Sequence, residues 1–300
     1  MSDRIEIVEV GPRDGLQNEP TPIPTEQKAA FIAALAAAGL QEIEATSFVS
    51  PKWVPQLGDA AELWPLLPKG PKYSALVPNA KGLERAIACG VDRIAVFTAA
   101  SESFVKRNIN MSRQESLDTF GAIIEQFRAA RPDGFVRGYV STVVGCPYEG
   151  AIDPDDVIGT ANSLLAMGVD EVSLGDTIGV AVPADLKPLF ALLYHIPHHQ
   201  VAWHFHDTRG TALANVEAAI EAGFRRFDSS AAGLGGCPYA PGAGGNLATE
   251  DLVYFAERSG LATGVNLAAL AEASRPILQA LAMAPRSKVQ QVALAETPAS

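Results

Sequence analysis

The sequence predicts a single (β/α)8 TIM barrel that spans residues 1–300. Three observations predict it: eight short β-branched or apolar runs, segments rich in alanine and leucine with helical spacing between most of them, and a recurring junction. At four of these junctions, such as AAGLQEIE and ACGVDRIA, a helix ends in glycine, one apolar residue follows, and a strand begins. Eight strands that alternate with helices favour a closed parallel barrel over an open doubly wound sheet.

The expected elements follow one another along the chain without a linker or a low-complexity segment that would separate a second domain. The eight strands are IEIVEVG from Ile5, EIEATSF from Glu42, KYSALVP from Lys72, RIAVFTAA from Arg93, VRGYVST from Val136, EVSLGDT from Glu171, VAWHFHD from Val201 and RFDSSA from Arg226. The helices between them include TEQKAAFIAALAAAGL, AKGLERAIACG, SLDTFGAIIEQFRAA, DPDDVIGTANSLLAMG and ALANVEAAIEAG. Residues 267–281 predict an extra C-terminal helix, and residues 295–300 predict a frayed tail.

Charge and cysteine content narrow the class of protein. A formal net charge of -11 argues against general affinity for nucleic acid or for an anionic membrane surface, so we expect no partner of either kind. The cysteines Cys89, Cys146 and Cys237 are far apart and show no metal-ribbon spacing, which favours a reducing compartment. The N-terminal residues pass almost directly into a β-rich run without a recognisable leader, and no apolar run is long enough to span a bilayer. A cytoplasmic location is therefore expected.

Two of the five histidines stand two residues apart in the seventh predicted strand. Side chains alternate along a strand, so His204 and His206 project to the same side, at a separation suited to one shared cation. Asp14 follows the first strand, which neighbours the seventh across the eighth in a closed barrel. With the Asn246 amide, these residues form a mixed nitrogen and oxygen set that favours Mg²⁺ or Mn²⁺ over structural zinc. The alternative is a hydrogen-bonded pair of histidines near a strand end.

Other polar residues gather at the carboxyl ends of the predicted strands, where barrel enzymes place their active sites. Arg13 is flanked by Gly-Pro and Asp-Gly, a setting in which a guanidinium can hold an oxyanion or a carboxylate. Glu44 and Asp176 lie within apolar strands, where a carboxylate is costly to bury without partners. We therefore expect hydrogen-bond partners and functional roles for both.

A glycine-rich segment, residues 233–246, follows the eighth strand. It lacks the strand-to-helix setting of a dinucleotide site, so no nucleotide or organic cofactor is expected to stay bound. Its glycines and prolines predict a lid loop that carries the Cys237 thiol over the barrel mouth. Cys237 is the reactive cysteine of this interpretation.

Seven motifs, in order from about residue 5 to 255, together resemble 3-hydroxy-3-methylglutaryl-CoA lyases: VEVGPRDGLQNE, IEATSFVSPKWVPQ, FTAASESFVKRNIN, GCPYEG, SLGDTIGV, HFHDTRGTALAN and GLGGCPYAPGAGGNLATEDLVY. The resemblance implies a metal-dependent enzyme that cleaves 3-hydroxy-3-methylglutaryl-CoA, an acyl-CoA, into acetyl-CoA and acetoacetate. It implies the metal ligands Asp14, His204, His206 and Asn246, and the catalytic residues Arg13, Glu44, Asp176 and Cys237. Asp14 with His204 is the expected base, although Asp176 could substitute. Glu44 is expected to orient Arg13 or the substrate.

The resemblance also implies substrate contacts and an assembly. Substrate contacts are expected from Arg13, Gln17, Ser47, Ser173 and Thr177. A homodimer is expected from the resemblance alone.

The chain departs from the family pattern at Arg209 and Thr211, where an aromatic residue and an amide are expected. Arg209 would form a surface ion pair or alter the acyl pocket. The second case keeps a related 3-hydroxyacyl-CoA open as the substrate, such as citramalyl-CoA or a longer-chain 3-hydroxyglutaryl-CoA.

Three more distant alternatives remain. A metal-dependent hydrolase barrel also uses paired histidines, but normally on its first strand. A condensing enzyme of the isopropylmalate synthase type normally carries further C-terminal domains. A non-catalytic binding barrel would not need every proposed ligand and acid.

Overall fold

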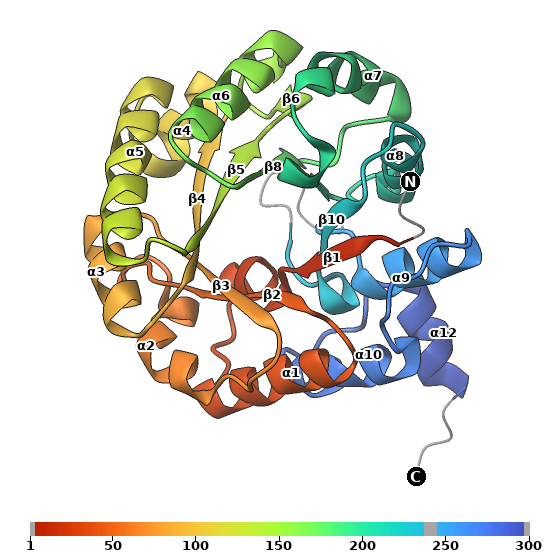
Figure 1. The fold of residues 1–300 in the computed structure, drawn as a ribbon. Coiled ribbons are helices and arrows are strands. Elements are labelled where there is room, and N and C mark those ends of the chain that lie inside the picture. Colours follow the sequence, from red (N-terminus) through yellow and green to blue (C-terminus); the bar gives the residue numbers. More distant parts are fainter. Residues whose placement is uncertain (1–3, 237–244, 297–300) are drawn as a thin grey trace.

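The computed structural model of the protein describes residues 4–236 and 245–296. Eight parallel strands close into a barrel, and helices surround it (Figure 1). The order around the barrel is β1, β10, β9, β8, β5, β4, β3 and β2, and β1 pairs with both β10 and β2. These strands are β1 (Glu6–Glu9), β2 (Glu42–Ser47), β3 (Lys72–Leu76), β4 (Arg93–Ala99), β5 (Phe135–Ser141), β8 (Glu171–Asp176), β9 (Val201–Phe205) and β10 (Arg226–Ser229). The predicted barrel and its eight strands are confirmed.

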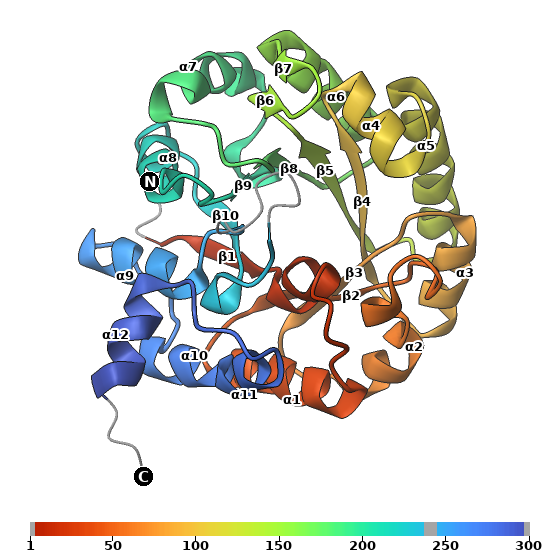
Figure 2. The same cartoon turned by 180° about the vertical axis from the view of Figure 1, so that it is seen from behind.

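Helices follow the strands and pack on the outer face of the barrel (Figure 2). They are α1 (Thr25–Ala37), α2 (Ala60–Leu63), α3 (Ala80–Ala88), α4 (Glu102–Ile109), α5 (Arg113–Ala130), α6 (Pro154–Ala166), α7 (Pro183–Leu192), α8 (Ala212–Glu221) and α9 (Thr249–Arg258). The loop after β5 also holds a small antiparallel hairpin of β6 (Gly145–Cys146) and β7 (Gly150–Ala151), which the sequence pattern did not predict.

The C-terminal region differs from the prediction. In place of one helix over residues 267–281 there are two, α10 (Leu267–Ala273) and α11 (Arg275–Ala280), with a break at Ser274. Pro276 explains the break, because proline lacks the amide hydrogen that would continue the first helix. A further helix, α12 (Lys288–Glu296), was not predicted and includes the first two residues of the expected tail. Residues 297–300 lie outside the described part of the chain.

Alternation along β9 shows how the barrel separates its two faces. Trp203 and Phe205 are fully buried on the outer face, where the Trp203 ring meets the Phe190 ring of α7 with centroids 5.3 Å apart. The residues between them point inward, which places His204 inside the barrel.

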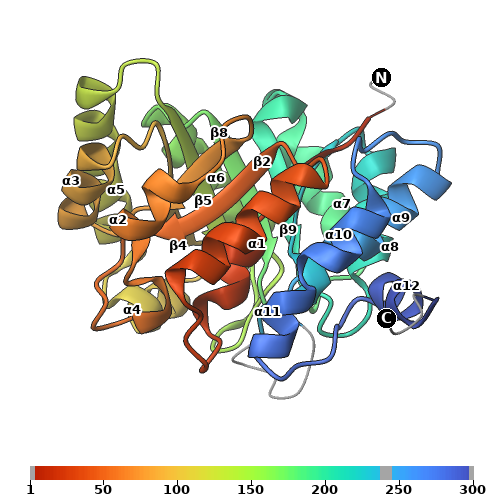
Figure 3. The ribbon, with the colours of Figure 1, turned by 90° about the horizontal axis from the view of Figure 1, so that it is seen from below.

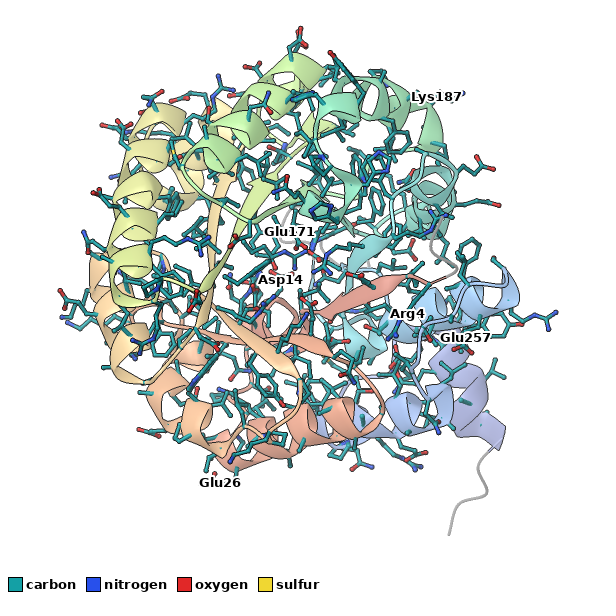
Figure 4. The ribbon with its side chains drawn as sticks, in the orientation of Figure 1. Arg4, Asp14, Glu26, Glu171, Lys187 and Glu257 are labelled. Atoms are coloured by element: carbon teal, nitrogen blue, oxygen red, sulfur yellow. The ribbon has the colours of Figure 1, made fainter. Side chains whose placement is uncertain are left out.

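Charged side chains, rather than aliphatic ones alone, occupy the barrel interior. Arg137 of β5, Glu171 of β8 and Asp228 of β10 are all buried there. Figure 4 shows Glu171 and Asp14 within the ring of strands. In a side view, α4 and α11 lie at the same end of the barrel (Figure 3). That end is the one to which the strands point their carboxyl ends, because α4 begins directly after β4.

Among the described residues, no helix combines the length and the apolar character that a membrane crossing requires.

Candidate active site at the carboxyl ends of the strands

A single turn of π-helix, Gly11–Gly15, follows β1 and positions the first two site residues. The Val10 carbonyl accepts the amide hydrogens of Arg13, Asp14 and Gly15 at 3.2, 2.7 and 3.1 Å, so the chain turns sharply at the barrel mouth. The close approach of Leu234 favours glycine at position 15, since a Cβ there would lie 2.9 Å from Leu234 Cβ and 2.8 Å from Ser230 Oγ. The turn directs Arg13 into the barrel and leaves Asp14 half-buried above it.

The two histidines of the seventh barrel strand face the same region. His204 and His206 are both 6% exposed, and their ring centroids are 5.2 Å apart. His206 also forms an isolated antiparallel bridge with Asn246, which brings the far side of the glycine-rich segment next to the pair.

Asp14, His204 and His206 can each offer a ligand atom within 4.8 Å of the other two. The strand order explains this proximity, because only β10 separates β1 from β9. Burial would raise the pKa of Asp14, but Arg13 and the neighbouring polar groups lower it to about 2. Burial lowers the pKa of His206 to about 3. At neutral pH the carboxylate is therefore ionised and the imidazole neutral, the forms that donate electron pairs to a cation.

Orphaned polar atoms at this cluster test whether a cation fits. Asn246 Nδ2 donates to Asp14 Oδ2 at 2.8 Å and to the Leu234 carbonyl at 3.1 Å, which leaves Oδ1 as an acceptor. Asn246 Oδ1 and His206 Nδ1 are buried and have no hydrogen-bond partner among the described residues. Unsatisfied buried acceptors are costly, and a divalent cation with nitrogen and oxygen ligands would satisfy such a set. The residues therefore fit the expected metal.

Arg13 is held from two sides by carboxylates. Its Nε donates to Glu44 Oε1 in a short contact, and its Nη1 lies 2.7 Å from Asp14 Oδ1. Burial alone would lower the pKa of Arg13, but the two carboxylates raise it above its usual value. The other Glu44 oxygen accepts the Tyr139 hydroxyl at 3.1 Å, and the Arg13 guanidinium lies 5.4 Å from the centre of the Tyr139 ring. The predicted partner for buried Glu44 is thus present.

Asp176 ends β8 and is fully buried. Its two oxygens accept the amide hydrogens of Val180 and Ala181 at 3.1 and 2.8 Å, which ties down the loop after the strand. Burial raises the pKa of Asp176, and these hydrogen bonds only partly oppose the rise. The predicted partners of this carboxylate are backbone amides.

The four expected substrate-contacting residues other than Arg13 lie in different settings. Ser47 and Ser173 are fully buried: the first donates to the Leu76 carbonyl at 3.2 Å and the second to Asp228 at 2.8 Å. Gln17 and Thr177 are half-buried, one after the π-helical turn and one directly after β8.

Two sequence expectations concern loops near the mouth. Cys237 and most of the predicted lid, residues 237–244, lie outside the described residues, so the lid and its thiol stay predictions. Arg209 donates to the carbonyls of Ile178 and Gly179 at 2.9 and 3.0 Å. It thus bonds to backbone oxygens of the neighbouring loop, and no ion pair of Arg209 occurs among the described residues.

The sequence interpretation gave no role to three buried residues that border the site. Asp228 accepts from His204 Nδ1 at 3.2 Å and from Arg137 at 2.5 Å. The guanidinium groups of Arg13 and Arg137 lie 5.4 and 5.1 Å from the centre of the Tyr139 ring. A signal was present, since Arg137 and Asp228 are charged residues inside two predicted strands. The two residues lie 91 positions apart in the sequence, so the pattern could not show that they pair with each other.

Comparisons with known proteins agree with this fold. The HMGL-like family model matches residues 4–277. The mitochondrial hydroxymethylglutaryl-CoA lyase of Bos taurus is 53% identical over 291 residues, which cover 96% of this chain and 89% of the bovine protein. The structure of hydroxymethylglutaryl-CoA lyase from Pseudomonas aeruginosa superposes with a TM-score of 0.95 at 47% identity and covers 99% of both chains.

A third similar protein was solved with ligands. It is an HMG-CoA lyase from Acinetobacter baumannii in complex with coenzyme A and 3-methylmalate, with a TM-score of 0.91, 39% identity and coverage of 97% of this chain and 95% of that one. The resemblance first drawn from seven motifs is confirmed across nearly the whole length. The chain belongs to the HMGL-like family, with the hydroxymethylglutaryl-CoA lyases as its near relatives.

Proposed function

We propose that this protein is a carbon–carbon lyase that cleaves 3-hydroxy-3-methylglutaryl-CoA into acetyl-CoA and acetoacetate. The observation that carries the proposal is the convergence of Asp14, His204 and His206 within 4.8 Å, beside a buried arginine, in a chain of this family. The coenzyme A bound to the Acinetobacter baumannii relative supports an acyl-CoA substrate.

Four residues would hold the divalent cation: Asp14, His204, His206 and Asn246. Their oxygen and nitrogen atoms suit Mg²⁺ or Mn²⁺, and the orphaned Asn246 Oδ1 supports the amide as a ligand. When bound, the cation would polarise the 3-hydroxyl and a neighbouring acyl oxygen, so that a modest base can take the hydroxyl proton.

Within the pair of Asp14 and His204, the Asp14 carboxylate would accept that proton, because a carboxylate has a second oxygen when one binds the cation, whereas His204 would use its one free electron pair on the cation. The electron pair of the C2–C3 bond then passes to the thioester carbonyl, which gives acetoacetate and the enolate of acetyl-CoA. Asp176 is the alternative base, and its raised pKa suits a proton acceptor.

Arg13 would stabilise the charge that develops on the enolate oxygen. Its Nε and Nη1 are taken by Glu44 and Asp14, so we assign the substrate contact to Nη2. One such donor in a water-excluded site contributes about 3 kcal/mol to transition-state stabilisation. Glu44 would orient this guanidinium, and Cys237 would deliver the proton that C2 of the enolate needs to become acetyl-CoA.

Residues at the carboxyl ends of the strands would also decide which substrate is preferred. Our proposed substrate contacts remain Gln17, Ser47, Ser173 and Thr177. The bonds of Arg209 to two loop carbonyls support a structural role for this departure from the family pattern, and so favour 3-hydroxy-3-methylglutaryl-CoA over citramalyl-CoA or a longer-chain substrate.

A homodimer, a cytoplasmic location and one catalytic domain over residues 1–300 belong to the same proposal. Light scattering tests the dimer, cell fractionation tests the location, and limited proteolysis tests the domain.

One assay tests the activity. Metal-stripped protein is mixed with 3-hydroxy-3-methylglutaryl-CoA, Mg²⁺ or Mn²⁺ is added, and acetoacetate release is followed for the native chain and for His206→Ala. We expect release that depends on the metal and that is lost in the variant, because the variant lacks one proposed ligand. The matched control is His199→Ala, an exposed histidine just before β9, which should retain native activity.

Absence of release from native protein that binds Mn²⁺ would reject the substrate. Turnover of citramalyl-CoA in the same assay would then favour the related lyase.

A further inference from the structure

Asp228 lies directly beside a proposed metal ligand. Asp228 of β10 and His204 of β9 are paired in the register of neighbouring parallel strands, and both side chains face the barrel interior. His204 Nδ1 lies 3.2 Å from Asp228 Oδ2, and the two residues are 6% and 1% exposed. The carboxylate is thus the hydrogen-bond partner of the imidazole on the side away from the proposed cation.

This contact decides which imidazole nitrogen carries hydrogen. A carboxylate can only accept, so the Nδ1 atom that faces Asp228 must be the donor. The neutral imidazole then has its free electron pair on Nε2, the atom left to face Asp14 and His206. Metal-binding histidines in general use such a partner to fix the ring and its tautomer.

Asp228 is itself held in place by two further donors. Ser173 Oγ donates to the same Oδ2 at 2.8 Å, and Arg137 Nη2 donates to Oδ1 at 2.5 Å. Both oxygens are therefore engaged, and these hydrogen bonds hold the buried carboxylate next to His204.

Arg137 connects this carboxylate to a buried ionic layer that continues toward the other end of the barrel. Its Nε lies 2.9 Å from Glu171 Oε1, and Arg226 pairs with Glu171 and with Glu42. Buried ion pairs are often less stabilising than well-packed apolar residues of similar volume. A role beyond stability would account for this layer, and its end at His204 indicates what that role is.

We propose that Asp228, clamped by Arg137 and Ser173, is the positioning residue that orients His204 and fixes its Nδ1–H tautomer so that Nε2 faces the metal site. The inference rests on the metal site of the proposed function. It goes beyond that proposal by assigning the carboxylate behind the ligand.

The first test measures Mn²⁺ affinity rather than turnover. In Asp228→Asn the side-chain amide has one acceptor oxygen, whereas the carboxylate accepts from Arg137, Ser173 and His204. We expect the amide oxygen to stay with the charged Arg137, so that the NH₂ group faces His204. The imidazole would then adopt the Nε2–H tautomer, which cannot bind the cation. Loss of such outer partners weakens metal binding about 10- to 100-fold, so we expect a rise of this size in the Kd for Mn²⁺, measured on metal-stripped protein by electron paramagnetic resonance of free Mn²⁺.

A matched control is Asp170→Asn. Asp170 pairs with Arg128 at 2.6 Å just before β8, so this variant also removes a carboxylate from an arginine pair. It should bind Mn²⁺ with native affinity.

A second variant distinguishes a direct loss of metal affinity from a loss caused by misfolding. Asp228→Asn leaves Arg137 buried with one carboxylate fewer, whereas Asp228→Leu combined with Arg137→Met removes both charges and leaves His204 Nδ1 without an acceptor at this position. We expect the double variant to keep the native circular dichroism spectrum and to show the same loss of Mn²⁺ affinity.

The tautomer gives a separate readout on the native chain. Two-bond ¹⁵N correlations of histidine-labelled, metal-free protein should show His204 protonated at Nδ1, with the signal identified by its absence in His204→Ala. Protonation at Nε2 in the native protein would overturn the inference, as would Mn²⁺ affinity within about twofold of native in either folded variant.

These outcomes separate the inference from the proposed function. Native protein that binds Mn²⁺ but releases no acetoacetate rejects 3-hydroxy-3-methylglutaryl-CoA as the substrate, while the role of Asp228 is still judged by Mn²⁺ affinity and tautomer. Native protein that releases acetoacetate, with folded Asp228 variants that bind Mn²⁺ normally, rejects the role of Asp228 alone.

Discussion

Replacement of Glu44 by glutamine tests how the buried arginine is held. Glu44 is fully buried, with one oxygen on Arg13 Nε and the other 3.1 Å from the Tyr139 hydroxyl. Glutamine keeps the shape but loses the charge. Its single acceptor oxygen serves only one of the two donors, and its NH₂ group then opposes the other. Arg13 keeps Asp14 as its remaining carboxylate partner, at 2.7 Å.

The magnitude follows from these contacts. Removal of one partner from a buried ion pair costs about 3–5 kcal/mol, and the retained Asp14 places Glu44→Gln near the lower figure, about 3 kcal/mol. An unfolding entropy of about 2.1 cal/mol/K per residue makes this a fall in Tm of about 5 °C for a chain of 300 residues. A displaced Arg13 would stabilise the enolate less well, so kcat should fall about 100-fold with a smaller change in KM.

Thermal unfolding and the acetoacetate assay measure the two effects on one preparation. The control is Glu26→Gln, an exposed glutamate in the first turn of α1, which should change the free energy of unfolding by less than about 0.5 kcal/mol and leave kcat unchanged. The reasoning is refuted if Glu44→Gln matches this control in both Tm and kcat.

Three further changes probe other parts of the molecule. Asn246→Ala removes the amide that donates a hydrogen bond to Asp14 and carries the unpartnered Oδ1. The Kd for Mn²⁺, measured by calorimetric titration, should therefore rise at least about tenfold, and native affinity would exclude Asn246 as a ligand. Burial raises the pKa of Glu250 from 4.5 to about 8, so the folded chain holds a proton that the unfolded chain releases, and this contribution to stability is lost as the pH rises from 4.5 through 8. Glu250→Gln should therefore flatten the decline in Tm between about pH 5 and 8, and an unchanged slope would contradict the assignment. Gly39 has φ +107°, and a Cβ there would lie 2.4 Å from the Gly264 carbonyl oxygen. Gly39→Ala should therefore lower the free energy of unfolding by more than about 1 kcal/mol while kcat is retained, and an unchanged Tm would contradict the expected strain.

The barrel was predictable because its signals are local. Strand and helix periods, glycine at helix ends and the alternation in VAWHFHD each depend on a few adjacent residues. The convergence of Asp14 with His204 and His206 was also predictable, because the order of strands in a closed barrel makes the first and seventh strands near neighbours. The break between α10 and α11 was missed although Pro276 marks it, since the apolar spacing continues across the proline.

The sequence by itself determined the barrel, the inward face of the histidine pair and the kinds of ligand that meet at the mouth. Only the tertiary structure decided which buried charges pair: Glu44 with Arg13, and Asp228 with both His204 and Arg137. Periodicity specifies the face of a strand on which a residue lies, but the partner across the barrel depends on the register and tilt of all eight strands together. The orientation of one imidazole is therefore set by a carboxylate 24 residues further along the chain and an arginine on β5, across the barrel interior.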